Sequence, residues 1–374
     1  MTIEIPRETI IRGFLLQSGW GGAAAEPLAG DASTRRYIRL RRDSGATALL
    51  MDAPPKAESA ACPPDADEAM RQKLGYNAVA RLAGPDSRRF GAFAQTLQAR
   101  GLAPPDILDA DYDQGLLVLE DLGDDLYARA IEKGEPEAPL YEAAVDVLLA
   151  LHATQAPPAL GAVEPRVPLL AYDALAYKAE VDLLVEWLYP LLIGKPLSLD
   201  LRAEWDALWQ KALSAIRVGT HVIVLRDYHA ENLFWLPERH GLHRVGLIDF
   251  QDGLSGSPAY DLVSLLEDAR RDVDAGLAST MLERYVTGAT NRDRHFDEEG
   301  FKSDFALLGA QRNAKILGIF ARLWRRDKKP AYLKLIPRVW RYVERDLDAP
   351  ALADLKAWFD KNLPADLRIA PDAK

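Results

Sequence analysis

Cysteine, an excess of positive charge and long apolar runs are all lacking from this sequence. Cys62 is the only cysteine, which excludes an intrachain disulfide and a thiolate-rich metal site. The net charge of −10 argues against broad binding to nucleic acid, because phosphate backbones require a basic face. No apolar stretch approaches the ~18–20 residues of a membrane span. The opening residues, "MTIEIPRETIIRGFL", include acidic side chains and no secretory core. We therefore expect a soluble, cytoplasmic protein without membrane or nucleic-acid partners.

The composition is that of an ordinary globular protein, with 48% hydrophobic and 27% charged residues. A chain of 374 residues exceeds the usual size of one compact core, which favours two lobes. Apolar periodicity predicts strands at 37–41, 47–52, 116–119, 222–225, 233–236 and 245–248, and helices at 7–19, 87–100, 138–153, 171–189, 200–217, 260–288 and 301–326. Residues 56–86 resemble an insertion that could hold a helix at 66–82. The pattern predicts an α+β fold with a small sheet-rich lobe at 1–120 and a large, mainly helical lobe at 121–374.

Polar residues interrupt the apolar sequence in "VLRDYHAENLFW" (224–235) and again in "VGLIDFQDG" (245–253). Asp227 follows one expected strand, Asn232 precedes the next, and Asp249 follows the third. Each residue alone is most simply a turn former. Together, their order and spacing match what phosphoryl transfer from a nucleotide requires. One carboxylate orients and deprotonates the attacking hydroxyl, whereas an Asn oxygen and a second carboxylate hold Mg²⁺.

These stretches resemble the catalytic loop and metal-binding segment of the aminoglycoside phosphotransferase and choline kinase group, which has a protein-kinase-like two-lobed fold. The resemblance implies that Asp227 is the catalytic carboxylate and that Asn232 and Asp249 are metal ligands. Leu225 stands where the group prefers His, which leaves open how the loop is braced. In "GSPAYDLVSLL" we expect Asp261 to be a structural carboxylate that accepts backbone N–H bonds near the loop.

Within that group, three further stretches resemble bacterial cell-wall kinases that phosphorylate N-acetylmuramate and N-acetylglucosamine at the anomeric carbon. They are "DASTRRYIRL", "LLMDAPP" and "GAQRNAKILGIFARLWRRDKKPAYLKLIPRVW". The resemblance implies an enzyme for a small-molecule sugar, with ATP or GTP and Mg²⁺ as cofactors, and we expect it to be a monomer. Its product would be an α-1-phosphate that enters cell-wall recycling.

The first lobe departs from the wider kinase pattern at its phosphate-binding elements. A glycine-rich loop is missing, and we expect Ser33 and Thr34, with nearby backbone N–H groups, to cradle phosphate oxygens. The strand that usually supplies a phosphate-binding Lys has Met51 instead. Arg35, Arg36 and Lys56 are the alternatives for the missing charge, although each could equally be a solvated surface residue.

Two other segments are candidates for binding nucleotide and sugar. "LVLEDLGDD" (117–125) matches the hinge of the kinase fold, and backbone groups from Glu120 to Leu122 are expected to bind adenine. A basic run on the expected helix 301–326 suits a sugar that bears a carboxylate, whereas an aminoglycoside pocket should be lined by acids. The substrate candidates there are Gln311, Arg312, Lys315 and Arg322. At helical spacing Gln311, Lys315 and Arg322 share a face opposite Ile316, Ile319, Phe320 and Leu323, and such a run is usually a solvated helix face.

The sequence thus predicts an ATP-dependent kinase for a hydroxyl of an amino sugar, most simply the anomeric hydroxyl. One alternative is a kinase of the same fold that acts on an aminoglycoside or another small alcohol. Another is a non-catalytic nucleotide-binding module, which the missing Lys at position 51 would favour.

Overall fold

The computed structural model describes residues 5–28, 35–55, 61–217 and 221–371, and the chain forms two compact units. The first unit contains Met1–Glu135, Pro157–Leu169 and Glu231–Asp252, and the second contains Pro136–Ala156, Leu170–Ala230 and Gly253–Lys374. The α+β class is confirmed, because the long antiparallel sheet lies in the first unit and the second is mostly helical. The lobe boundary at 120/121 stays a prediction.

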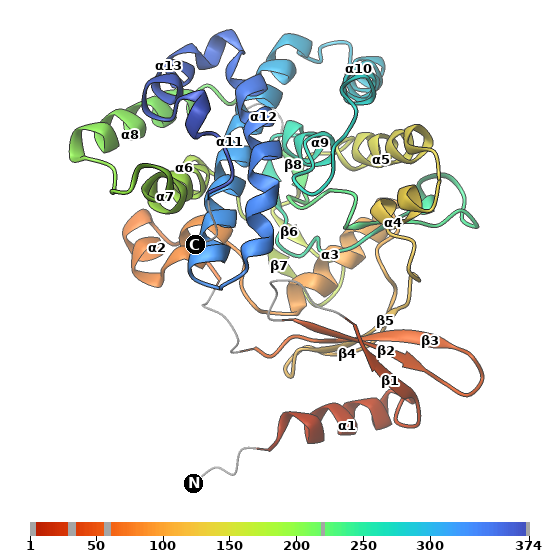
Figure 1. Ribbon diagram of the computed structural model, residues 1–374. Coiled ribbons are helices and arrows are strands. Elements are labelled where there is room, and N and C mark those ends of the chain that lie inside the picture. Colours follow the sequence, from red (N-terminus) through yellow and green to blue (C-terminus); the bar gives the residue numbers. More distant parts are fainter. Residues whose placement is uncertain (1–4, 29–34, 56–60, 218–220, 372–374) are drawn as a thin grey trace. The chain divides into compact units, whose positions relative to one another are not determined.

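An antiparallel sheet of five strands, in the order β1-β2-β3-β5-β4, forms the centre of the first unit (Figure 1). Its strands are β1 (Ala24–Pro27), β2 (Arg36–Arg41), β3 (Thr47–Asp52), β4 (Ile107–Asp111) and β5 (Leu116–Glu120). The sequence predicted the three inner strands, β2, β3 and β5. It missed β1 and β4, which are edge strands without a buried residue and therefore lack an apolar signature.

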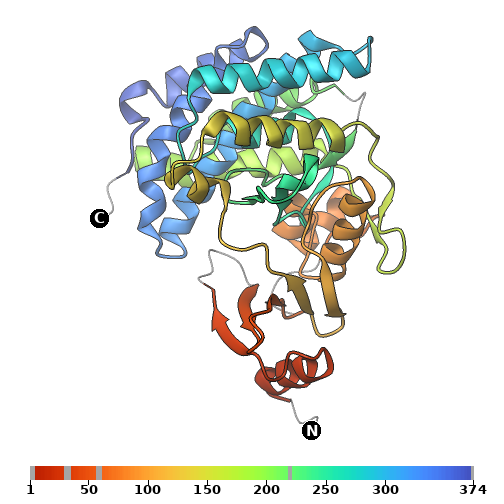
Figure 2. The same cartoon turned by 90° about the vertical axis from the view of Figure 1, so that its right-hand side faces the viewer.

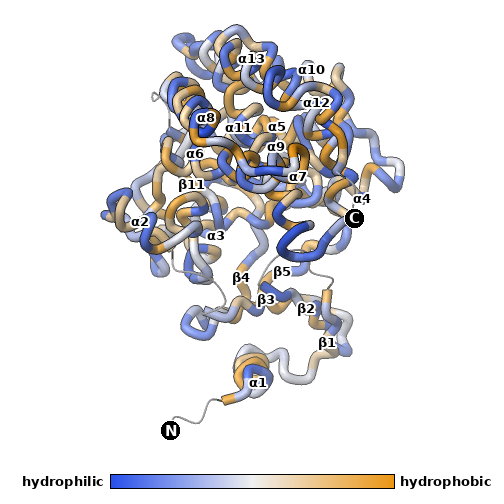
Figure 3. Tube along the Cα trace, turned by 60° about the vertical axis from the view of Figure 1, so that its left-hand side comes forward, coloured by the Kyte–Doolittle hydropathy of each residue, from blue (hydrophilic) through white to orange (hydrophobic). Residues whose placement is uncertain are grey.

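Helix α1 (Arg7–Gln17) packs on this sheet and confirms the expected N-terminal helix. Phe14 is buried in a cluster with Leu40 and Leu50 of the sheet, and Ile10 and Ile11 pack against that cluster. The helix carries both apolar and polar residues in Figure 3, as an amphipathic surface helix should.

The remainder of the first unit is made of short elements. They are α2 (Glu68–Leu74), the π-helix η1 (Asn77–Arg81), α3 (Arg88–Ala99), α4 (Tyr127–Glu132), β6 (Ala159–Leu160), β7 (Val167–Pro168), β9 (Leu233–Trp235), η3 (Gly241–Arg244) and β10 (Val245–Leu247). The expected helix at 66–82 is thus two shorter helices. Ser87, the residue before α3, does not cap this helix through its side chain. Its hydroxyl donates to the carbonyl oxygen of Tyr112, and Asp86 accepts the N–H of Arg88 instead.

The second unit contains most of the helices. They are α5 (Glu137–Leu151), α6 (Ala174–Leu183), η2 (Leu184–Leu188), α7 (Tyr189–Ile193), α8 (Leu199–Leu213), α9 (Ala259–Leu266), α10 (Ala275–Arg292), α11 (Glu298–Arg325), η4 (Pro330–Leu335), α12 (Ile336–Leu347), η5 (Pro350–Leu352), α13 (Ala353–Asn362) and η6 (Ala365–Leu367), with the paired strands β8 (Val222–Val224) and β11 (Leu254–Gly256). No helix of the described residues has the length and apolar content that a membrane crossing requires.

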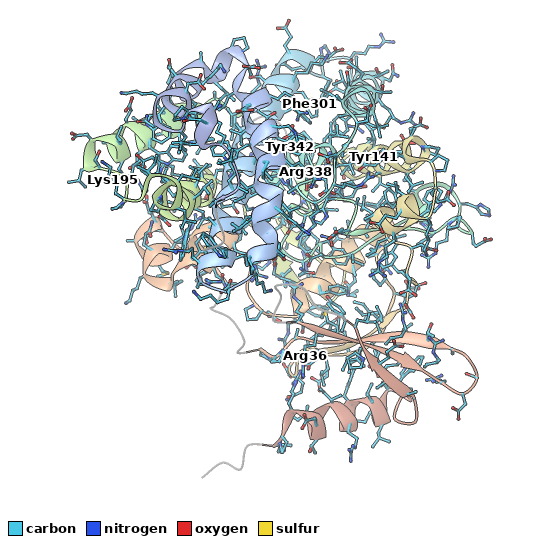
Figure 4. All side chains as sticks on the ribbon, in the orientation of Figure 1. Arg36, Tyr141, Lys195, Phe301, Arg338 and Tyr342 are labelled. Carbon is cyan, nitrogen blue, oxygen red and sulfur yellow. The ribbon has the colours of Figure 1, made fainter. Side chains whose placement is uncertain are left out.

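Helix α11 is the central helix of this unit and contacts α6, η2, α9 and α12. Figure 1 shows α12 beside it, and Figure 4 marks Arg338 and Tyr342, one turn apart on α12. Figure 2 shows α10 along α5, where the Arg284 guanidinium pairs with Asp146. Because α11 is covered on several sides, four of its polar residues are buried: Asp304, Gln311, Arg312 and Asn313.

The single helix expected at 260–288 is two helices, α9 and α10, separated by a turn at 267–274. Asp268 stabilises that turn, because its Oδ1 accepts the backbone N–H of Arg270 at 2.8 Å. Apolar periodicity continues across the turn and concealed the break.

Candidate active site

The hairpin of β9 and β10 places two candidate metal ligands at one end of the same ribbon. Leu233 pairs with Leu247. Asn232, just before β9, therefore lies opposite Ile248, just after β10. The Ile248 N–H donates to the Asn232 carbonyl oxygen at 3.2 Å, and Asp249 comes next in the chain. Asn232 and Asp249 thus offer the hard oxygen donors that suit Mg²⁺, which keeps several water or phosphate ligands. In the described residues, no three His, Cys, Asp or Glu side chains could hold a metal by themselves.

Arg35 is the basic residue that the structure places beside Asp249. Its guanidinium lies 3.2 Å from Asp249 Oδ1 and 3.9 Å from Asp252 Oδ1. By contrast, Arg36 pairs with Asp52, whose other oxygen accepts a hydrogen bond from Arg7 at 2.6 Å. Arg35 therefore differs from Arg36 in contacting a candidate metal ligand. Lys56, the third alternative, lies outside the described residues, as do Ser33 and Thr34.

The segment after Asp249 is anchored to α3. Phe250 is fully buried, with its ring 4.8 Å from that of Phe90 and 6.1 Å from that of Phe93. The Arg89 guanidinium donates to the Gln251 carbonyl oxygen at 2.8 Å. Aromatic packing and a buried hydrogen bond thus hold the backbone that carries Asp249.

The expected adenine-binding connection follows β5 directly. The Glu120 N–H donates to the Asp106 carbonyl oxygen at 2.8 Å, and the Glu120 carboxylate pairs with Arg239. Leu122 is 8% exposed and packs at Gly246, where an added Cβ would lie 3.0 Å from its Cδ1. The Glu120 side chain thus forms an ion pair within the protein. The contact between adenine and the backbone from Glu120 to Leu122 stays a prediction.

The loop that carries Asp227 is braced by Asp261 in the second unit. The Asp261 carboxylate is fully buried and accepts the N–H groups of Leu225 at 2.7 Å and Arg226 at 2.8 Å. The prediction that Asp261 is a structural carboxylate is confirmed. These two bonds hold the loop backbone, although Leu225 offers no polar side chain of its own.

A second brace comes from Arg226, which sequence reasoning missed. Its backbone has a φ of +71°, a conformation that non-glycine residues rarely adopt and that persists only where the surroundings enforce it. Its guanidinium is buried, pairs with Glu180 of α6 and lies 4.7 Å over the ring of Tyr172. Arg226 directly precedes Asp227, so the ion pair fixes the turn from which the candidate catalytic carboxylate extends.

Asp227 lines a cavity of about 120 Å³ together with residues of α11 and of the turn between α9 and α10. The lining residues are Asp227, His229, Asp268, Ala269, Arg270, Arg312, Lys315, Ile316, Ile319 and Phe320. Burial alone would raise the pKa of Asp227, but the nearby cations, Lys315 first, outweigh it and hold the pKa below its ordinary value. Burial lowers the pKa of His229 to about 4, so this imidazole is neutral at pH 7.

The basic run on α11 divides into residues with different surroundings. Arg312 and Lys315 line the cavity beside Asp227, whereas Gln311 donates to Glu180 at 3.1 Å and to the Tyr177 carbonyl oxygen at 3.2 Å. Arg322 is half-buried and does not line that cavity. The interpretation of this run as a solvated helix face is wrong for Gln311 and Arg312, which are 0% and 4% exposed. The expected separation from Ile316, Ile319 and Phe320 is also wrong, because these side chains line the same cavity.

The fold and these residues define a small-molecule kinase. The ADP-bound aminoglycoside phosphotransferase APH(2″)-Ib superposes with a TM-score of 0.52 at 14% identity, over 92% of this chain and 98% of the other. An ethanolamine kinase from Plasmodium vivax gives a TM-score of 0.56 at 11% identity, over 94% and 93% of the two chains. Both likenesses show the protein-kinase-like fold.

The sequence comparisons show the family. The model of the phosphotransferase enzyme family matches residues 24–296, and the chain belongs to this family. An N-acetylmuramate/N-acetylglucosamine kinase from Caulobacter vibrioides is 48% identical over 98% of this chain and 100% of its own length. A kinase of the same name from Pseudomonas aeruginosa is 32% identical over 91% of this chain and 90% of its own.

Proposed function

We propose that this enzyme transfers the γ-phosphoryl group of ATP, or of GTP, to the anomeric hydroxyl of N-acetylmuramate or N-acetylglucosamine. The observation that carries the choice of acceptor is the cavity beside Asp227, whose wall places three cations, Arg270, Arg312 and Lys315, against the two carboxylates Asp227 and Asp268. A polycationic aminoglycoside calls for an acidic wall, whereas neutral or anionic sugars tolerate cations. The names of the relatives that cover almost the whole chain support the same acceptor.

Each candidate residue receives one role in this reaction. Asp227 orients the sugar hydroxyl and accepts its proton, and its lowered pKa keeps it ionised at neutral pH. Asn232 and Asp249 would hold Mg²⁺, which neutralises phosphate charge when bound. Catalysis then depends mainly on alignment and on charge stabilisation, because the protein makes little covalent chemistry. The cytoplasmic location and the monomeric state remain predictions.

The acceptor is tested with purified enzyme, ATP and Mg²⁺ against N-acetylmuramate, N-acetylglucosamine and a panel of aminoglycosides, with coupled detection of ADP. We expect turnover of both sugars and none of the aminoglycosides. Phosphorus NMR should show a sugar phosphate that mild acid hydrolyses, as an anomeric phosphate does. Turnover of an aminoglycoside without turnover of either sugar would contradict the proposal.

Met51 stands where related kinases carry a phosphate-binding Lys. We propose that Arg35 supplies the missing positive charge. Its guanidinium already lies beside Asp249, where phosphate and metal are expected. Arg35→Ala should lower kcat/KM for ATP by about 10²-fold, the order for loss of one preorganised charge-stabilising group.

The neighbouring Arg36 offers a matched control, because its side chain is 62% exposed and Arg7 still pairs with Asp52 when Arg36 is removed. Arg36→Ala should therefore leave kcat/KM for ATP close to the wild-type value. Equal losses in the two variants would show that Arg35 has no special role at the phosphates.

A further inference from the structure

Two buried polar atoms in the wall of the cavity beside Asp227 have no hydrogen-bond partner among the described residues. They are Nη1 of Arg312 and Oδ2 of Asp268, on side chains that are 4% and 1% exposed. Their neighbouring atoms are satisfied, because Arg312 Nη2 donates to the Ser264 hydroxyl at 2.8 Å and Asp268 Oδ1 accepts from Arg270. A buried donor or acceptor without a hydrogen-bond partner costs stability. We therefore expect a bound ligand to form hydrogen bonds with both atoms.

The two other cations in this wall, Arg270 and Lys315, already have partners: Arg270 Nη1 lies 3.4 Å from His229 Nε2. Lys315 Nζ lies 2.8 Å from Oε1 of Glu180, a carboxylate that is 1% exposed. Arg312 Nη1 is thus a cationic donor without a partner among the described residues, and Asp268 Oδ2 is a carboxylate oxygen without one. A ligand carboxylate would satisfy Arg312 but would be repelled by Asp268. A group that both accepts and donates a hydrogen bond fits better than an anion does.

Apolar side chains complete the wall. Ile316 is 9% and Phe320 is 4% exposed, and Ile319 lines the same cavity. The cavity volume of about 120 Å³ leaves room for a small substituent rather than for a second ring. An acetamido group has a carbonyl acceptor, an N–H donor and a methyl group in a body of this size. A lone hydroxyl would leave the apolar part of the wall without a partner.

We propose that this cavity receives the acetamido group at C2 of the sugar, and that Arg312 and Asp268 select 2-acetamido sugars over other hexoses. Arg312 donates to the carbonyl oxygen, Asp268 accepts the amide N–H, and Ile319 and Phe320 contact the methyl group. The inference rests on the proposed sugar-kinase function. It agrees with the covalent structure of the sugar, because the C2 substituent neighbours the anomeric hydroxyl that Asp227 would orient.

The first test uses the wild-type enzyme and compares kcat/KM for N-acetylglucosamine, glucosamine and glucose. We expect N-acetylglucosamine to be preferred by about 10²-fold or more, because the other two leave buried polar atoms unpaired. Similar kcat/KM values for N-acetylglucosamine and glucose would overturn the inference and leave the sugar-kinase function intact. Phosphorylation of no sugar at all would overturn the proposed function itself.

The second test measures the same preference in Arg312→Met and Asp268→Asn. Asparagine can still accept the Arg270 N–H while presenting an NH₂ group where the acetamido N–H would donate. In both variants the ratio of kcat/KM for N-acetylglucosamine to that for glucose should fall at least tenfold.

Arg325→Met is the matched control for the second test, because Arg325 is an exposed arginine on the same helix. In this variant the ratio of kcat/KM for N-acetylglucosamine to that for glucose should stay at the wild-type value. The ratio reports on folded enzyme alone, since an unfolded fraction lowers both activities equally. An unchanged ratio in the two cavity variants would overturn the assignment.

Discussion

Asp227→Asn is expected to lower kcat by about 10²–10⁴-fold, the contribution of a positioned general base. The asparagine side chain keeps the size of the aspartate but cannot take the proton of the sugar hydroxyl. Because cations hold the pKa of Asp227 below its ordinary value, the carboxylate is ionised across the neutral range. The ratio of wild-type kcat to the kcat of the variant should therefore be nearly constant from about pH 6 to 9.

The measurement pairs steady-state kinetics with calorimetric titration of ATP, whose dissociation constant should remain near the wild-type value. Asp200→Asn is the control, because Asp200 is an exposed carboxylate on α8 outside the cavity. A variant at position 227 that retains more than about a tenth of kcat would show that the carboxylate is not the base.

The local part of the candidate site could be predicted from the sequence. Asp227, Asn232 and Asp249 flank short runs of buried apolar residues, and β8, β9 and β10 lie within one residue of the strands expected there. Asp261 was recognised in the same way, because a carboxylate in an otherwise buried helix needs donors and the loop offers its N–H groups. These inferences depend on neighbours in the chain or on matched motifs.

The walls of the cavity could not be predicted in this way. On α11 the periodicity separates Lys315 from Ile316 and Phe320, but that separation assumes that one face of the helix is wet. Since α6, η2, α9 and α12 all contact α11, polar residues such as Gln311 and Arg312 are buried as well as apolar ones such as Phe320. The role of Asp268 was missed for a related reason, because apolar periodicity predicted one continuous helix through the turn in which Asp268 lies.

Glu180 is the residue that sequence reasoning missed most completely. It lies within "ALAYKAEVDLLVEWL", where a glutamate among other charged residues resembles the polar side of an amphipathic helix. In the structure it is 1% exposed and its carboxylate accepts hydrogen bonds or ion pairs from Tyr172, Arg226, Gln311 and Lys315. Arg226 is 46 positions away in the chain, so the pair becomes visible only when α6, α11 and the loop are packed together.

Glu180 therefore neutralises two cations that lie next to the candidate catalytic carboxylate. Burial by itself would raise the pKa of Glu180, but Lys315 and Arg226 outweigh burial and lower it. The carboxylate is thus ionised at neutral pH and compensates the buried charge of Arg226. Without it, the strained backbone at Arg226 would lose the ion pair that holds it.

Glu180→Gln should lower the free energy of unfolding of the second unit by about 3–5 kcal/mol, because it leaves a buried arginine without its counter-ion. Guanidinium titration followed by tryptophan fluorescence measures this loss, since Trp205, Trp209, Trp340 and Trp358 are all buried in that unit. Glu186→Gln is the matched control. Its side chain is 51% exposed, 4.0 Å from Arg202, and the change should stay within about 0.5 kcal/mol. If both variants unfold alike, the contacts of Glu180 contribute no more than an ordinary surface ion pair.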